Sequence, residues 1–101
     1  MAKIQRRDAE KALAPVAEQY VFWSHDGRVI RDLKELAEAL NTMSDETFAY
    51  HSNAEKHDFS NWVRDIMGDA KLAGDLEQAT SRLPAARMVA DRVVLLSKKL
   101  A

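Results

Sequence analysis

The sequence of 101 residues contains no cysteine, only three glycines and only two prolines. Without cysteine the chain can form no disulfide scaffold, no thiolate metal site and no cysteine nucleophile. The shortage of glycine and proline argues against a sandwich or a barrel, because these folds need many tight turns. Combined with 47% hydrophobic and 31% charged residues, these absences predict one folded, helix-rich domain with a single core.

Long apolar segments are also missing. The longest apolar run near the C-terminal end covers residues 93–96, far short of the roughly 20 residues that a membrane span requires. The first ten residues carry five charged side chains and no apolar stretch follows them, so they do not resemble a secretory signal. We therefore expect a cytoplasmic protein that makes no contact with a membrane.

Sequence signatures of common enzyme families are lacking as well. The chain has no glycine-rich phosphate-binding loop, and its serines have no Gly-x-Ser-x-Gly context. These absences exclude the usual NTPase and serine hydrolase chemistries.

Charge is distributed unevenly along the chain, although the net charge is only −1. Residues 1–31 carry a net +2, residues 32–79 a net −7 and residues 80–101 a net +4. This pattern predicts that the basic ends lie against the acidic middle, within one molecule or between two. We do not expect the basic ends to bind nucleic acid, because neither interleaved aromatic residues nor a known motif accompanies them.

The first third of the chain predicts a weak helix followed by a β-hairpin. Residues 3–14 have a helix-forming composition but a poor apolar stripe that ends at Pro15, so we expect a loose helix or an arm. In residues 20–31 two apolar runs flank Asp26 and Gly27, which predicts a hairpin closed by a type I′ turn. Because two strands alone are marginally stable in water, this hairpin should lie on helices.

Capped amphipathic helices are predicted over the rest of the chain. Glu35 can complete a capping box with Asp32, Gly68 ends one helix, and Pro84 suits the first turn of a last helix over about residues 84–100. Apolar residues at helical spacing follow four possible N-caps, which are Asp32, Ser44, Asp58 and Asp69. The expected fold class is mainly α: a small helical domain of four or five short helices with a minor β-hairpin near residues 20–31.

Several motifs resemble a family of small uncharacterised prokaryotic domains that is common in archaea. They are Leu33-x-Glu35-Leu36-Ala37, the pair Tyr50-His51, Asp58-Phe59-x-x-Trp62-Val63 and Gly68-Asp69. The resemblance covers about residues 20–76. The flanks lie outside the resemblance. We expect one domain over residues 1–101, in which a family-like core (20–79) lies between an N-terminal arm or helix (1–19) and a C-terminal amphipathic helix (80–101). Since the family has no known function, the resemblance implies no catalytic residue and no cofactor.

The three histidines are the side chains best suited to bind a metal or to act as a base near neutral pH. His25 precedes Asp26 at the predicted turn and His57 precedes Asp58 at a predicted helix cap, so ordinary turn and cap roles explain both His-Asp pairs. We therefore expect no metal. The weaker alternative is a zinc or iron site built from His51, His57, Asp58 and His25.

His51 is the most informative of the three histidines. Phe48 and Tyr50 precede it and Phe59 and Trp62 follow it, so its imidazole should lie at an aromatic seam with Asp58 within reach. One interpretation is a ligand, a base or a pH-sensitive switch. The interpretation that we favour is structural: a ring N–H that bonds a carboxylate or a backbone carbonyl and holds the turn.

Candidate interaction residues lie in the hairpin and in the last helix. Trp62 falls on the apolar stripe of its helix and should be core, whereas Trp23 lies on a hairpin with more faces than a small core covers. The last helix carries Met88, Val89, Val93, Leu96 and Leu100 on one stripe, which Val94 and Leu95 widen. We take Trp23, Met88, Val94 and Leu95 as the interaction candidates.

These features rank three functions. The first is a non-enzymatic protein-interaction or adaptor module, with a homodimer or another protein as the expected partner. The alternatives are a small metal-binding protein or metal-dependent enzyme centred on His51 and, lower still, a nucleic-acid-associated regulator. Instead of a dimer, the N-terminal helix with Ile4 and Leu13 could cover the extra apolar face of the last helix within one chain.

Overall fold

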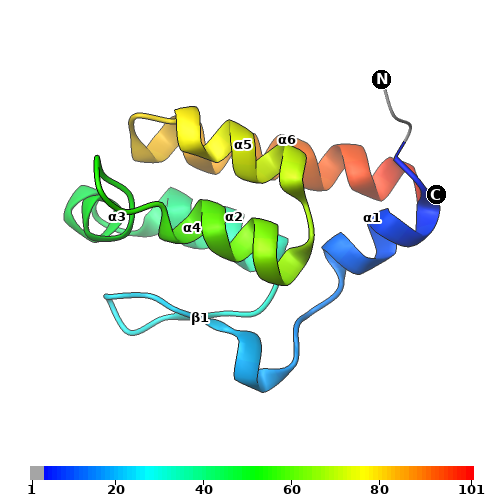
Figure 1. Cartoon of the computed structure of the whole chain (residues 1–101), viewed down its shortest axis with the longest axis horizontal. Coiled ribbons are helices and arrows are strands. Elements are labelled where there is room, and N and C mark those ends of the chain that lie inside the picture. Colours follow the sequence, from blue (N-terminus) through cyan, green and yellow to red (C-terminus); the bar gives the residue numbers. More distant parts are fainter. Residues whose placement is uncertain (1–3) are drawn as a thin grey trace.

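The computed structural model describes residues 4–101 and has a mainly α architecture with one small hairpin, the predicted fold class (Figure 1). Lys3, which belongs to the predicted first helix, lies outside the described residues. Residues 6–13, expected as a loose helix or an arm, form a full helix, which brings the number of α-helices in residues 4–101 to six. These are α1 (Arg6–Leu13), α2 (Leu33–Thr42), α3 (Asp45–His51), α4 (Asp58–Trp62), α5 (Ala70–Gln78) and α6 (Arg82–Lys98).

Helices α2 and α6 form an antiparallel pair, against which α1 and α5 pack. At the start of α6, the Nη1 group of Arg82 donates to the backbone oxygens of Leu40 and Asn41 at the end of α2, both at 2.9 Å. Helix α5 follows α6 along one side of the molecule, and α4 lies between α5 and the hairpin (Figure 1). Helix α1 packs on α6, and Arg6 Nη2 donates to the backbone oxygen of Leu100 at 3.3 Å. Helix α1 and the C-terminal end of the chain therefore meet at one end of the molecule.

Three of the four predicted helix caps are present. In each, a side-chain oxygen accepts from the backbone N–H three residues later at 2.8–3.1 Å, and the capping residues are Asp32, Ser44 and Asp69. Glu35 also reaches back as predicted, but it accepts from the backbone N–H of Arg31, one residue before the cap. These bonds span few residues, so sequence alone could predict them.

The fourth cap, Asp58, is a correction to the prediction. His57 occupies the N-cap position of α4 and makes no side-chain capping bond. Asp58 is the first residue of the helix, and its carboxylate bonds His51 instead of capping the helix. The predicted helix over residues 58–67 also changes its winding. It begins as α4 and widens into one π-helical segment, η2 (Val63–Met67), before Gly68 ends it at φ +79°.

The hairpin consists of β1 (Phe22–Trp23) and β2 (Val29–Ile30), with Phe22 opposite Ile30. Its turn corrects the predicted type I′, which needs positive φ at two successive residues. Among the described residues only Gly27 and Gly68 have positive φ. Gly27 N–H donates to the Ser24 oxygen and Ser24 N–H donates to the Arg28 oxygen, both at 2.9 Å. The loop therefore has three residues, with a left-handed glycine in its last position.

The first strand is shorter than predicted because Tyr20 belongs to a 3-10 turn, η1 (Glu18–Tyr20). The indole Nε1 of Trp62 donates to the backbone oxygen of Tyr20 at 2.8 Å. This bond from α4 holds the entry to the hairpin against the helices, as a marginal two-stranded ribbon requires.

The core has an aromatic part and an aliphatic part. Phe22 of the hairpin stacks on Phe59 at a centroid distance of 5.1 Å and meets Trp62 edge-on at 5.9 Å. Trp62 is buried, as predicted. The aliphatic part includes the stripe of α6, where Val89 and Leu96 are buried and Met88, Val93 and Leu100 are partly buried.

A buried ion pair joins α6 to the start of α5. Arg92 holds the carboxylate of Asp69 with two bonds of 2.8 and 2.9 Å, and both side chains are largely buried. Arg82 likewise pairs with Asp45 at 2.9 Å. Within the chain, the basic C-terminal segment thus contacts the acidic middle at two points. No helix in residues 4–101 is long and apolar enough to cross a membrane.

Candidate functional site

His51 is the last residue of α3, and its side chain is 5% exposed. Aromatic rings surround it: the centroid of Phe22 lies at 5.0 Å, that of Tyr50 at 4.9 Å and that of Phe59 at 5.2 Å. The predicted aromatic seam is therefore present. It is formed by the hairpin, α3 and α4, three elements that meet only in the folded chain.

Both ring nitrogens of His51 have partners inside the fold. Nε2 accepts from the backbone N–H of His25 at 2.9 Å, and Nδ1 lies 2.9 Å from Oδ2 of Asp58. Because a backbone N–H can only donate, Nε2 must present its lone pair, so the proton is on Nδ1 and points at the carboxylate. This geometry assigns the neutral Nδ1–H tautomer to His51.

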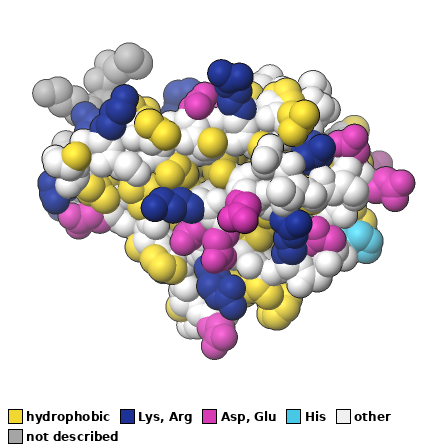
Figure 2. All heavy atoms as spheres, turned by 180° about the vertical axis from the view of Figure 1, so that it is seen from behind, with side chains coloured by type: hydrophobic (Ala, Val, Ile, Leu, Met, Phe, Trp, Pro, Cys, Tyr) yellow, Lys and Arg dark blue, Asp and Glu magenta, His cyan; other side chains and the backbone are white. Residues whose placement is uncertain are grey.

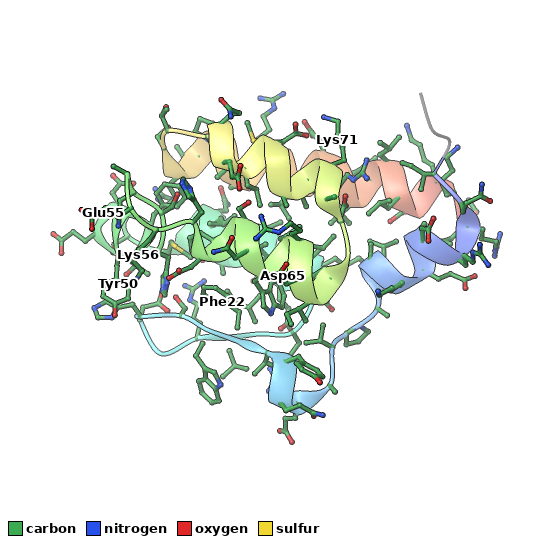
Figure 3. All side chains as sticks on the ribbon, in the orientation of Figure 1. Phe22, Tyr50, Glu55, Lys56, Asp65 and Lys71 are labelled. Carbon is green, nitrogen blue, oxygen red and sulfur yellow. The ribbon has the colours of Figure 1, made fainter. Side chains whose placement is uncertain are left out.

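The contacts of His51 continue into a closed circuit of five residues, the His51 cluster: His25, Tyr50, His51, Lys56 and Asp58. Lys56 Nζ lies 3.4 Å from Oδ2 of Asp58 and 4.1 Å from the centre of the Tyr50 ring. The imidazole of His25 stacks on the same ring at 3.9 Å, with an interplanar angle of 13°. Figure 3 shows Tyr50 and Lys56 side by side near the hairpin tip.

The His51 cluster has the parts of an acid–base dyad but not its open position. A catalytic histidine oriented by a carboxylate needs its second nitrogen free for a substrate proton. In the His51 cluster that nitrogen is bonded to a main-chain N–H and the ring is buried. The arrangement therefore suits a structural role, in which His51 holds the hairpin tip against α3 and α4, as the structural interpretation expects.

Asp26 lies at the hairpin tip, next to His25 of the His51 cluster. Partial desolvation raises the pKa of its carboxyl, but the neighbouring Ser24 hydroxyl, the hydrogen bond from the Arg28 N–H and the Arg28 charge together outweigh it and lower the pKa below the ordinary 3.8. The Arg28 guanidinium lies 3.6 Å from the carboxylate. Asp26 thus stabilises the three-residue loop in its ionised form.

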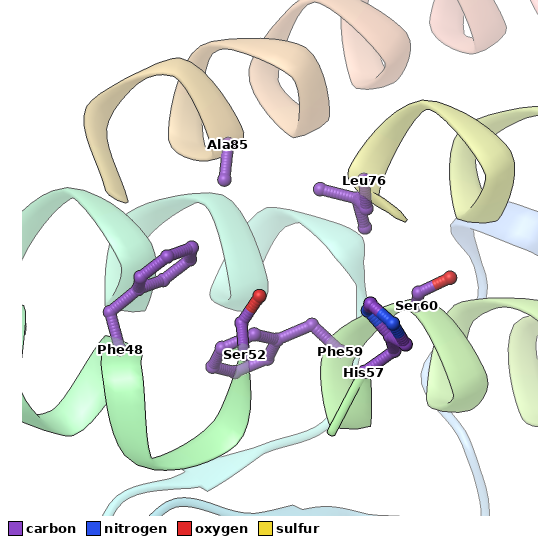
Figure 4. Close-up of a pocket in the computed structure, with 7 residues that line it drawn as sticks. All are labelled: Phe48, Ser52, His57, Phe59, Ser60, Leu76 and Ala85. Carbon is purple, nitrogen blue, oxygen red and sulfur yellow. The ribbon is translucent and has the colours of Figure 1, made fainter. Parts of the chain in front are cut away.

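His57 lines a small cavity between α3, α4, α5 and α6, shown in Figure 4. The cavity measures about 10 Å³, room for a single water molecule. Ser60, which also lines it, donates its hydroxyl to the backbone oxygen of Ala73 at 2.6 Å. A cavity of this size with a committed hydroxyl holds no substrate.

The metal alternative finds little support in the positions of its proposed ligands. Among residues 4–101, no three His, Cys, Asp or Glu side chains are placed to hold one ion. His51 and Asp58 bond each other, while His25 contributes its backbone N–H to His51 and its ring to Tyr50. His57 faces the water-sized cavity instead.

The four candidate interaction residues differ in exposure. Trp23 is 69% exposed on the outer side of the hairpin. On α6, Val94 and Leu95 are 55% and 44% exposed, whereas Met88 is half-buried and packs on the core. Leu83, which is 57% exposed near the start of α6, is not among the predicted interaction residues, because α6 begins at Arg82, two residues before the predicted start.

Val94 and Leu95 do not form one widened stripe. With about 100° of rotation per residue, they lie on opposite borders of the exposed arc of α6. Arg87, Asp91 and Lys98 lie between them. Helix α1 covers part of the remaining apolar surface, since Ala9 and Ala12 are buried and Ile4 and Leu13 pack on the core. The chain therefore covers part of the wide arc by itself and leaves the two borders exposed.

Comparison of the chain with protein-family models, with curated proteins and with solved structures finds no match. The resemblance to small prokaryotic domains of unknown function stays a prediction.

Proposed function

We propose that this chain is a non-enzymatic protein-interaction module whose first partner is a second copy of itself. The observation that carries the proposal is the outer face of α6. Its inner face is already packed on α2, α5 and α1, yet Leu83, Val94 and Leu95 remain large and exposed. Leu83 and Val94 lie on the same border of the exposed arc of α6 and Leu95 on the other, so a partner that contacts either border buries apolar surface.

The hairpin offers a second apolar surface. Trp23 is the most exposed large hydrophobic side chain of the described residues, and tryptophan contributes more to protein interfaces than most residue types. It lies in β1 next to Phe22, whose ring centroid is 5.0 Å from that of His51. A module with two separate apolar surfaces can pair with itself through one and bind another protein through the other.

The closed His51 cluster also favours this function over metal-dependent catalysis. A base or a metal ligand needs a free lone pair at the site of reaction. In the cluster, the lone pair of Nε2 is taken by the His25 N–H.

The test is the mass in solution as a function of concentration, by sedimentation or light scattering. We expect a species of roughly twice 11.4 kDa at micromolar concentration, weakened when Val94 or Leu95 is replaced by Glu. Comparison of Val94→Glu with Leu95→Glu identifies the border of α6 that makes the contact. A wild-type protein that stays monomeric over the whole concentration range, with Glu at either position or without it, would contradict self-association.

A further inference from the structure

The outer edge of β2 carries main-chain groups that the fold uses only in part. Successive residues of an antiparallel strand direct their N–H and C=O groups to opposite sides. The Ser24 N–H bonds the Arg28 oxygen across the hairpin, so Val29, the next residue along the chain, directs both groups away from β1. Neither group has a hydrogen-bond partner among residues 4–101. We call this edge, from Val29 to Arg31, the β2 edge.

The β2 edge already binds extended chain at one point. Arg31 follows Val29 by two residues, so its main-chain groups face the same way. Its oxygen accepts from the backbone N–H of Val16 at 2.9 Å, and Ala14 and Ala17 on either side of Val16 have extended dihedral angles. A segment of this chain thus occupies the far end of the edge, whereas the position at Val29 is open.

A hollow lies beside the open position, between β2 and α2. It measures about 280 Å³. The Arg31 N–H, on the same edge, donates to the Glu35 carboxylate, so the edge faces α2. An extended chain that pairs with Val29 directs every second side chain to the face of the hairpin on which Ile30 is buried, toward α2. The residues that line the hollow are Arg28, Val29, Ile30, Glu35, Glu38 and Ala39.

The charge that is available in the hollow is negative. The Arg28 guanidinium is used within the chain, because it donates to the Thr42 hydroxyl and lies 3.6 Å from the Asp26 carboxylate. Glu35 is bonded at the start of α2, whereas Glu38 is exposed and takes part in no ion pair among residues 4–101. Figure 2 shows acidic side chains gathered near the middle of this face, between α6 and the hairpin.

We propose that the β2 edge binds an extended segment of a partner protein, which pairs with Val29 and places a lysine or arginine side chain in the hollow beside Glu38. The inference rests on the proposed function as an interaction module, but not on self-association. A helix would not satisfy this edge, because its own N–H and C=O groups are already bonded. An added strand gains affinity from main-chain bonds and selectivity from pockets for alternate side chains.

The test is the binding of a short synthetic peptide to the whole chain, followed by NMR. The probe is a peptide of alternating valine and lysine, capped at both ends. We expect the Val29 amide to shift and to exchange its hydrogen more slowly when the peptide is bound. The Trp23 amide is the internal control, because it points outward from the opposite edge of the hairpin and should not change.

A reversal of charge tests the role of the hollow. Glu38→Lys should weaken binding of the valine-lysine peptide roughly tenfold at low salt and allow a valine-glutamate peptide to bind instead. Glu46→Lys is the matched control, because it makes the same change at an exposed residue of α3 that does not line the hollow. It should weaken binding less than about twofold. The helical circular dichroism of both variants should match that of the wild type.

A valine-lysine peptide that is N-methylated at every residue separates strand pairing from charge attraction. It keeps the lysines but has no N–H to donate, so we expect it not to bind. Binding of this peptide as tight as that of the unmethylated one would overturn the inference. So would an unchanged Val29 amide, or equal effects of Glu38→Lys and Glu46→Lys.

The remaining outcomes distinguish this inference from self-association. Protection of the Val29 amide that grows with protein concentration, without peptide, would assign the β2 edge to a second copy and reject the inference. A dimer that binds no peptide would likewise reject the inference but leave self-association in place. A monomer that binds the peptide through Val29 would support the inference and contradict self-association.

Discussion

Polar side chains at the hairpin end of the molecule bond one another, whereas those on the outer face of α6 point to solvent. In the His51 cluster, His51 has both nitrogens bonded and Asp58 contacts both His51 and Lys56. On α6 the pair formed by Arg87 and Asp91 is long, at 3.9 Å, and both side chains are exposed. The His51 cluster pairs its polar groups within the chain, although the buried Ser24 hydroxyl nearby has no hydrogen-bond partner among the described residues. The outer face of α6 keeps its polar groups available.

This difference separates residues that stabilise the fold from residues that are free to meet a partner. A histidine beside an aspartate invites a catalytic interpretation, yet its closed hydrogen bonds assign it to the fold. Exposed apolar residues among free charges have no such internal role, so a partner explains them better. The predictions below test this division, beginning with the largest expected effect.

The two tryptophans provide the sharpest test. Trp62 is buried and donates to the Tyr20 oxygen, so Trp62→Ala should lower the free energy of unfolding by about 3–5 kcal/mol. Trp23→Ala, on the exposed side of the hairpin, should change it by less than about 0.5 kcal/mol. Urea denaturation of both variants measures the contrast. A loss below about 1 kcal/mol for Trp62→Ala would place it on the surface and revive it as a partner anchor.

Two arginines of α6 extend the test to ion pairs. Arg92→Ala leaves the buried carboxylate of Asp69 without its partner, and we expect a loss of about 3 kcal/mol. Arg87→Ala removes only an exposed pair, so its effect should stay below about 0.5 kcal/mol. Thermal or chemical denaturation compares them. Equal losses would show that the Arg92 pair contributes no more than a surface pair does.

The caps illustrate how much of the fold the sequence can predict. Asp32, Ser44 and Asp69 bond N–H groups three residues away, so their roles depend on local sequence alone. Asp58 has the same local pattern, but a neighbour in space competes for its carboxylate. The prediction of a type I′ turn is wrong for a similar reason. Asp-Gly suits more than one loop, and the pairing of Ser24 with Arg28 selects the three-residue form.

The contacts of the candidate site likewise differ in how well local sequence predicts them. His51 and Asp58 are seven residues apart, so their contact could be expected from the sequence. The N–H of His25 is 26 residues from His51, and Arg92 is 23 residues from Asp69, so both contacts depend on tertiary packing that periodicity does not encode. The exposure of Leu83 could be predicted only from the true start of α6. A Ser-Arg-Leu-Pro sequence with Ser81 as N-cap could have indicated it.

His51→Gln tests whether the closed cluster is structural. The amide cannot reproduce both bonds of the imidazole, so we expect a loss of roughly 1–3 kcal/mol in the free energy of unfolding. His25→Gln is the matched control, because it keeps the backbone N–H and removes only the stack on Tyr50, at a loss below about 1 kcal/mol. We also expect the purified protein to contain no stoichiometric transition metal. Elemental analysis that finds about one zinc or iron per chain, lost in His51→Gln, would support the metal-binding function instead.

The smallest predicted effect concerns Asp26 at the exposed edge of the same region. Its pKa is lowered in the folded state, so the ionised carboxylate stabilises the fold at pH values above the ordinary 3.8. That contribution falls away as the pH drops through the lower folded pKa. Because the group is largely solvated, its size should stay below about 0.5 kcal/mol.

Asp26→Asn isolates this contribution, because the amide keeps an oxygen for the Arg28 N–H and has no charge to titrate. The free energies of unfolding of the wild type and the variant should differ most at neutral pH and converge as the pH falls below 3.8. Measurement by urea denaturation at several pH values and low salt gives the difference directly. A difference that stays constant across this range would mean that the Asp26 charge contributes nothing. The polar groups at the hairpin tip would then stabilise the loop by hydrogen bonding alone.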